Sequence, residues 1–76
     1  MNQQHLKWRC RRGVLELDVI FERFWQQYTL PLTDELANAL AALLQEEDPA
    51  LLAWLVYRET PPTKHLMIVE TLLSPF

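Results

Sequence analysis

Residues 14–28 read VLELDVIFERFWQQY, and the spacing of their apolar side chains decides the fold class. Positions 14, 17, 21, 24, 25 and 28 fall on one arc at about 100° per residue, which is typical of an amphipathic helix. Residues 15–19 also alternate apolar and polar side chains with period two, as a strand would. We favour a helix over residues 14–28, because the helical period continues to Tyr28 and no turn signal or second alternating run supplies a pairing strand.

Five prolines and one glycine divide the rest of the chain into pieces of helical length. Before the central stretch, we expect a short helix over residues 3–11 that is ended or bent at Gly13. After it, Thr33 is a favourable cap for a helix over residues 34–46, whose first turn is acidic. The leucines expected to face the core from that helix are Leu36, Leu40, Leu43 and Leu44.

Two further helices are expected in the C-terminal half. Asp48 should cap the first of them, with Pro49 at its first position and an apolar run over residues 50–57. Thr63 should cap the second, over residues 64–73, because the proline pair before it forbids helix. Other expected core residues are Phe21, Phe24, Trp25, Trp54, Leu66, Val69 and Leu73. The sequence therefore predicts an all-α protein, a single-domain five-helix bundle over residues 1–76.

Composition limits the classes of protein to which the chain can belong. Half of the 76 residues are apolar, which excludes a disordered chain, and no apolar run approaches the ~20 residues of a membrane span. The polar segment Met1–Gln4 is not followed by the apolar core of a signal peptide. The one cysteine, Cys10, cannot form an intramolecular disulfide, which points to a reducing compartment. We expect a cytoplasmic monomer without membrane insertion.

The residues that could support catalysis are few. His5 and His65 lack the spacing of metal ligands and are expected on the surface. A single glycine excludes a glycine-rich phosphate loop. The neighbours Arg9 and Arg11 would lower the pKa of the Cys10 thiol, but no base or resolving cysteine accompanies it. We therefore expect no enzyme, no bound cofactor and no metal.

Charge is distributed unevenly along the chain, whose net charge is −3. Four bases, and no acid, occur in the first twelve residues: Lys7, Arg9, Arg11 and Arg12. This basic segment could steer an acidic partner, or be a solvated face without a function. The acidic remainder and the lack of a second basic helix argue against binding of nucleic acid.

Residues 8–18 read WRCRRGVLELD and resemble the N-terminal signature of the SdhE family. The family hallmark, R-G-x-x-E, is present as Arg12, Gly13 and Glu16. A second block that is similar to the family in order and spacing contains Asp48, Pro49, Leu52, Trp54 and Leu55. The resemblance covers about residues 6–73. It differs at the C-terminus, where the chain stops at Phe76 without the longer charged tail of some relatives.

This resemblance implies a five-helix fold and a function as an FAD assembly factor. Members bind the flavoprotein subunit of succinate dehydrogenase, and sometimes that of fumarate reductase, and promote the bond between a subunit histidine and the 8α-methyl carbon of FAD. A small helper without a cofactor site would contribute by holding a mobile region of its client in the reactive geometry. One family relative has been described as an antitoxin, so a regulatory interaction module is the alternative.

The hallmark and its neighbours give the candidate partner-binding residues. These are Trp8, Arg11, Arg12, Gly13, Leu15, Glu16, Val19 and Arg23. If Gly13 caps the second helix, the Glu16 carboxylate could reach back to the cap and pair with Arg12, which would be a purely structural role. Leu15 and Val19, however, lie on the otherwise polar side of the helix, as a docking surface would. Packing of the first helix over Leu15 is the alternative explanation.

Overall fold

The computed structural model describes residues 3–28 and 31–74, and within these ranges the chain forms helices and no strands. The helices are α1 (Gln3–Arg9), α2 (Leu15–Gln27), α3 (Asp34–Leu43), α4 (Asp48–Leu55) and α5 (Thr63–Leu73). The predicted all-α, five-helix fold is therefore confirmed. Met1 and Asn2 of the polar N-terminal segment, and the chain end at Phe76, lie outside the described residues.

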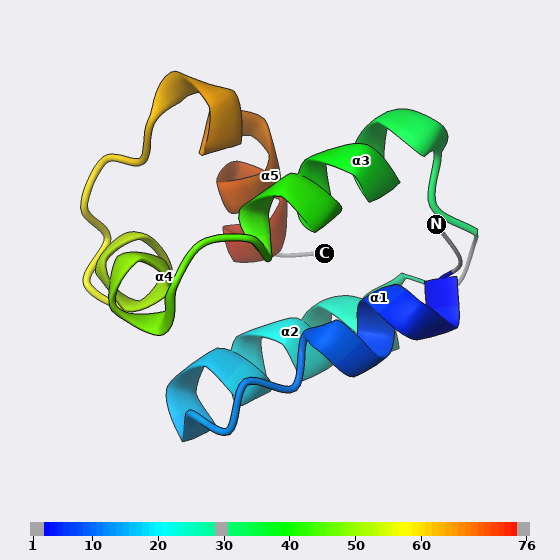
Figure 1. Cartoon of the computed structure of the whole chain (residues 1–76), viewed down its shortest axis with the longest axis horizontal. Coiled ribbons are helices and arrows are strands. Elements are labelled where there is room, and N and C mark those ends of the chain that lie inside the picture. Colours follow the sequence, from blue (N-terminus) through cyan, green and yellow to red (C-terminus); the bar gives the residue numbers. More distant parts are fainter. Residues whose placement is uncertain (1–2, 29–30, 75–76) are drawn as a thin grey trace.

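The helices enclose one shared core. Figure 1 shows α1 and α2 on one side of the molecule, with α3 and α5 opposite them and α4 at one end. Helix α3 packs on α5, α1 packs on α3, and α4 packs on both α2 and α5. All five helices contribute buried apolar side chains to a single cluster, including Leu6, Phe21, Phe24, Leu40, Leu51 and Leu72. Within the described part of the chain, no helix is both long enough and apolar enough to cross a bilayer.

The pattern of burial along α2 confirms the predicted helix and excludes the alternative strand. A strand would place Leu15, Leu17 and Val19 on one face, because alternate residues of a strand share a side. Instead Leu17 is fully buried, whereas Leu15 is 75% exposed and Val19 is 54% exposed. The helical arc of residues 17, 21 and 24 faces the core, as predicted.

Helix α3 agrees with its predicted start and buried face but ends early. The Thr33 hydroxyl accepts a hydrogen bond from the backbone N–H of Leu36 at 3.1 Å, which confirms the predicted cap. The four predicted leucines are buried. The helix ends at Leu43 and not at residue 46, because the chain tightens into a turn in which Glu46 N–H donates to the Leu43 carbonyl. Helix α1 also ends early, at Arg9 and not at residue 11.

The start of α4 was predicted wrongly. The cap residue is Glu47, and Asp48 is the first residue of the helix, with Pro49 second and the end at Leu55 and not at residue 57. Pro49 is tolerated there because the first turn has no intrahelical acceptor for its missing N–H. The Asp48 carboxylate is used elsewhere, as an acceptor for Arg12.

Helix α5 also differs from the sequence prediction. Thr63 is its first residue and caps nothing, since Pro62 occupies the cap position. His65 is not on the surface but fully buried, with Nε2 2.7 Å from Glu46 Oε2 and its ring against Trp54. The buried face of α5 consists of His65, Ile68, Val69 and Leu72, so Val69 is buried as predicted, whereas Leu66 is turned outward and 38% exposed.

Candidate partner-binding face

The guanidinium of Arg12 is directed inward, to the turn between α3 and α4. Nε donates to Asp48 Oδ1 at 2.9 Å, Nη1 to the Leu44 carbonyl at 3.0 Å and Nη2 to the Glu46 carbonyl at 2.8 Å. Carbonyls that follow a helix C-terminus lack intrahelical donors, so Arg12 supplies the hydrogen-bond donors that the backbone does not. Arg12 therefore ties the α1–α2 loop to a turn more than thirty residues away, and the predicted Arg12–Glu16 pair does not form.

The loop between α1 and α2 is held by a second contact and by one glycine. The backbone N–H of Arg12 donates to Asp18 Oδ1 at 2.9 Å. Gly13 has φ +79°, a left-handed conformation that favours glycine, while a Cβ built at this position would meet no atom within 4 Å. Glycine is thus favoured at position 13 by the left-handed backbone conformation, and not because a larger side chain would clash. Gly13 does not cap α2, because Val14 is the cap residue.

Glu16 has the exposed side chain of the hallmark, since Arg12 is partly buried and Gly13 has no side chain. It is the second residue of α2, and not the third as the capping hypothesis needed, and no side-chain hydrogen bond caps this helix. Among the described residues, none forms a hydrogen bond or ion pair with the Glu16 side chain. The proposed structural role, reaching back to the cap, is therefore wrong. Its carboxylate is available to another molecule.

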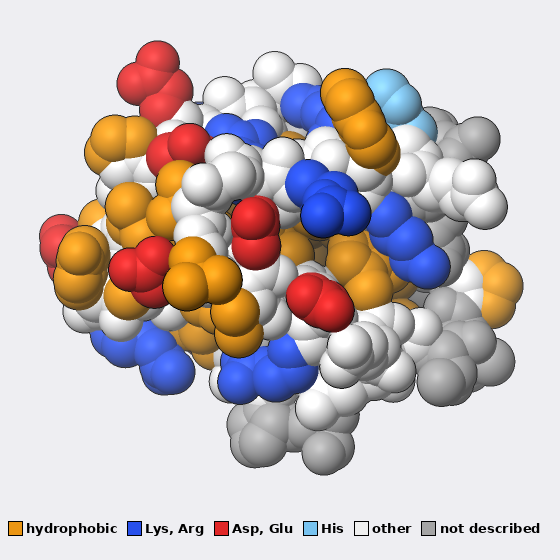
Figure 2. Space-filling model, turned by 90° about the horizontal axis from the view of Figure 1, so that it is seen from below, with side chains coloured by type: hydrophobic (Ala, Val, Ile, Leu, Met, Phe, Trp, Pro, Cys, Tyr) orange, Lys and Arg blue, Asp and Glu red, His pale blue; other side chains and the backbone are white. Residues whose placement is uncertain are grey.

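Five further predicted site residues are exposed on α1, on α2 or in the loop between them. Leu15 and Val19 are exposed as predicted, so the alternative in which α1 covers Leu15 is wrong. Arg23 on α2 and Arg11 after α1 are also exposed, and Trp8 is 71% exposed. Figure 2 shows hydrophobic side chains concentrated on the left half of the face in view and, to the right of its centre, a hollow bordered by Lys or Arg side chains above and by Asp or Glu side chains to the left and below.

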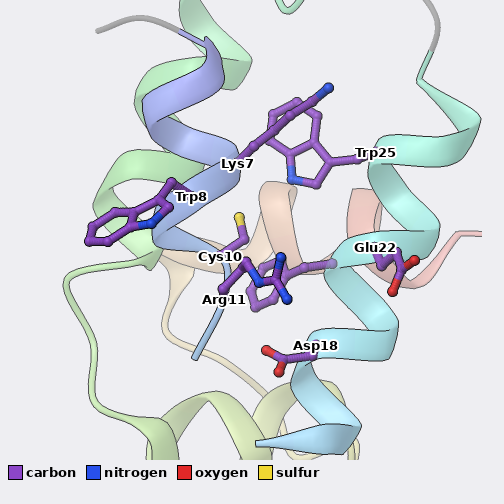
Figure 3. Close-up of a pocket in the computed structure, with 8 residues that line it drawn as sticks. Lys7, Trp8, Cys10, Arg11, Asp18, Glu22 and Trp25 are labelled. Carbon is purple, nitrogen blue, oxygen red and sulfur yellow. The ribbon is translucent and has the colours of Figure 1, made fainter. Parts of the chain in front are cut away.

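This hollow, of about 480 Å³, opens between α1 and α2. Its lining is Lys7, Trp8, Cys10, Arg11, Asp18, Phe21, Glu22 and Trp25. The Lys7 ammonium lies over the Trp25 ring, 5.3 Å from its centroid. Figure 3 shows Lys7 and Arg11 extending from the α1 side of the hollow toward the α2 side, which carries Asp18, Glu22 and Trp25.

Cys10 has the opposite reactivity to that expected from its neighbours in sequence. The side chain is buried, and desolvation raises the pKa of its thiol to about 11, outweighing a hydrogen bond from Trp25 and the charges of Arg12 and Arg9. A thiol in this state is a poor nucleophile at neutral pH. No group of three or more His, Cys, Asp or Glu side chains in the described ranges could hold a metal ion.

The structure separates the predicted site residues by exposure and contacts. Arg12 and Gly13 shape the loop, whereas Trp8, Arg11, Leu15, Glu16, Val19 and Arg23 are exposed. Sequence reasoning missed Asp18 and Asp48 as acceptors for Arg12, and Lys7, Glu22 and Trp25 around the hollow. The first two were visible only as members of the two sequence blocks that resemble the SdhE family. Nothing local in the sequence signals the hollow.

Comparisons with known proteins identify the family of the chain. The family model Sdh5, described as flavinator of succinate dehydrogenase, matches residues 4–75. A relative from Shewanella oneidensis, named FAD assembly factor SdhE, is 42% identical over 72 residues, which cover 92% of this chain and 88% of the relative. A relative of the same name from Legionella pneumophila is 40% identical over 68 residues, 90% of this chain and 86% of the relative. No solved structure matches the chain. The chain therefore belongs to the Sdh5 family, the flavinators of succinate dehydrogenase.

Proposed function

We propose that this protein is an FAD assembly factor, which binds the flavoprotein subunit of succinate dehydrogenase and promotes covalent attachment of FAD to it. The family and the names of its relatives support this function. The structural observation that carries it is Glu16, an acid of the family hallmark that is exposed, without an internal partner and flanked by exposed Leu15 and Val19. Both named relatives carry the assembly-factor name, so the antitoxin alternative is not proposed.

The protein acts by positioning its client and not by catalysis. The bond between a histidine and the 8α-methyl carbon needs loss of a methyl proton and close approach of the imidazole, and the flavoprotein's own groups can supply both. Holding a mobile client segment in the reactive geometry removes an entropic barrier without any group of the helper entering the reaction. The poorly nucleophilic Cys10 is consistent with this division of work. Fumarate reductase is a second candidate client.

The molecule works as a single domain and a monomer in the cytoplasm. The core shared by all five helices supports one domain, since no helix has a separate apolar cluster to bury. Docking would use Trp8, Arg11, Leu15, Glu16, Val19 and Arg23 directly. Arg12 and Gly13 would act on docking through the loop that they shape.

The test is complementation of a strain that lacks the gene, with covalent flavin on the client read as fluorescence in a denaturing gel. Deletion should leave the flavoprotein polypeptide present and sharply reduce its fluorescence. Wild type should restore the fluorescence, and Glu16→Gln should restore much less, because an interface contact needs the charge. Normal fluorescence in the deletion strain would refute the assembly function.

Glu35→Gln is the matched control. Glu35 is also exposed and is also the second residue of its helix, α3, so both substitutions remove the same favourable charge from a helix N-terminus. Each should cost less than about 1 kcal/mol of stability. Only Glu16→Gln should impair flavinylation. Equal flavinylation by the two variants would remove Glu16 from the interface.

A further inference from the structure

We propose that the hollow between α1 and α2 is a socket for an acidic side chain, aspartate or glutamate, of the flavoprotein subunit. The inference rests on the proposed function, because it names what part of that client the protein grips. It concerns Lys7, Arg11 and Trp25, none of which belongs to the R-G-x-x-E hallmark.

Donors around the hollow lack strong acceptors. The Lys7 ammonium and the Arg11 guanidinium form no ion pair with any described residue. Among the described residues, the Lys7 ammonium contacts the face of the Trp25 ring. The indole Nε1–H of Trp25 is buried and forms no well-aligned hydrogen bond with a described residue, and its interaction is with the Cys10 sulfur, a weak acceptor. A carboxylate would give this buried donor a stronger acceptor.

Acceptors around the hollow are, in contrast, already supplied with donors. Asp18 accepts from the backbone N–H of Arg12 at 2.9 Å, and Glu22 Oε1 accepts from Gln26 Nε2 at 3.4 Å. Neither bond is an ion pair, and despite the two acids in the lining Lys7 and Arg11 have no ion-pair partner among the described residues, so a carboxylate placed between the two cations would supply one. A carboxylate entering from solvent would meet two cationic donors and one indole donor, and charge-assisted hydrogen bonds of this kind are the stronger ones.

The walls of the hollow explain why the acid should belong to a protein surface. Phe21 and Trp25 supply apolar wall beneath the charged rim, so the methylene groups of a glutamate or a flanking apolar residue would be covered as the carboxylate docks. Leu15 and Val19 are exposed on α2, the helix that also supplies Asp18, Phe21, Glu22 and Trp25 to the hollow. A client that docks on Leu15 and Val19 is thus in position to insert the acid.

The two lysines of the chain allow a direct test, since one lies in the hollow and the other does not. A carbodiimide joins an amine to a carboxylate only where the two are in contact. In the complex with the flavoprotein subunit, Lys7 should become linked to an aspartate or glutamate of that subunit, identified by mass spectrometry. Lys64 is the internal control, because it lies 3.8 Å from Glu46 and should link to Glu46 with or without the client.

Variants separate the socket from folding and from net charge. Lys7→Gln with Arg11→Gln should weaken binding of the flavoprotein at least about tenfold, as expected for the loss of charge-assisted hydrogen bonds. Arg58→Gln with Lys64→Gln removes the same charge away from the hollow and should change affinity less than about twofold. Trp25→Phe keeps an aromatic wall in the hollow but removes the indole donor, so it should also weaken binding.

Each failure has a distinct meaning. A complex that forms without a Lys7 link, or a Lys7→Gln, Arg11→Gln variant that binds like wild type, would overturn the socket and leave the assembly function standing. A wild-type protein that forms no complex with the flavoprotein subunit would overturn both. A Lys7 link together with weak binding by the double variant establishes the socket.

Discussion

Arg12 illustrates how one residue of a recognition motif can serve the fold. Its three side-chain hydrogen bonds go to one carboxylate and two backbone carbonyls. A planar guanidinium fits three acceptors arranged in this way, whereas an ammonium on a flexible stem does not. Its contribution to function is therefore indirect, through the conformation of the loop that carries Gly13.

The first prediction concerns this contact. Arg12→Lys should lower the free energy of unfolding by about 1–3 kcal/mol, because at least one carbonyl in a partly buried hydrogen bond loses its donor. Asp48→Asn should cost less, about 1 kcal/mol, since an amide oxygen can still accept. Thermal unfolding followed by circular dichroism measures both. The neighbouring Arg11→Lys is the control, and the prediction is wrong if Arg12→Lys melts at the same temperature as Arg11→Lys.

At the scale of the helical element, the end of α4 contains the one strained residue in the described ranges. Arg58 has φ +61°, where a residue with a Cβ is disfavoured, and Glu59 N–H donates across it to the Ala53 carbonyl at 2.8 Å. Helices commonly end in this way, but with glycine at the left-handed position. The exposed arginine thus carries a conformational cost that the hydrogen bond across it offsets.

A second prediction follows from that strain. Arg58→Gly should stabilise the protein by about 0.5–1 kcal/mol, since left-handed backbone costs other residues about 1–2 kcal/mol and glycine's extra entropy in the unfolded chain offsets part of the gain. The melting temperature should rise by a few degrees, about what such an energy gives a domain of this size. Arg58→Ala keeps the strain and serves as control. Equal melting of the glycine and alanine variants would contradict the argument.

The helices themselves could be predicted from sequence, but several of their ends and contacts could not. The helical period of the apolar residues in 14–28 predicts which side of the helix is buried without knowledge of the elements that pack on it. Leu17, Phe21 and Phe24 were therefore predicted correctly. The Thr33 hydroxyl caps α3 by accepting from the backbone N–H of Leu36, only three residues later, so this contact is also visible in the local sequence. Asp48, in contrast, is bound by a residue 36 positions earlier, and only the tertiary fold creates that pair.

The buried contacts of His65 and Cys10 show the same limit. Glu46 lies 19 residues before His65 and supplies its partner, so nothing near His65 predicts burial. For Cys10, the sequence shows two adjacent arginines but not the core that surrounds the thiol. Burial then reverses the expected direction of the pKa shift. Functional roles assigned from neighbours in sequence are therefore the least secure predictions.

For the whole molecule, the thiol of Cys10 couples stability to pH. Its pKa is raised from 9.0 to about 11 in the folded state, chiefly by burial. Between these values the unfolded chain has lost the thiol proton and the folded chain has kept it, so stability falls as pH rises. The contribution is complete below pH about 9 and is lost as pH passes about 11.

The third prediction is the size of this effect. Unfolding by urea should show a loss on the order of 2–3 kcal/mol between pH about 8 and pH about 11, at about 1.4 kcal/mol per pKa unit. Cys10→Ala removes the titrating group and should lose less over the same interval, because only the other residues then respond. Parallel pH curves for wild type and Cys10→Ala would show that the thiol titrates equally in both states.

The burial of the only cysteine also makes this protein suitable for selective labelling. A maleimide dye at neutral pH reacts with exposed thiolates, and Cys10 offers neither exposure nor thiolate. A cysteine placed at Val19 would thus be the single reactive position without any need to replace Cys10. A fluorophore there would stand in the middle of the exposed α2 face and report, in real time, when another protein covers it.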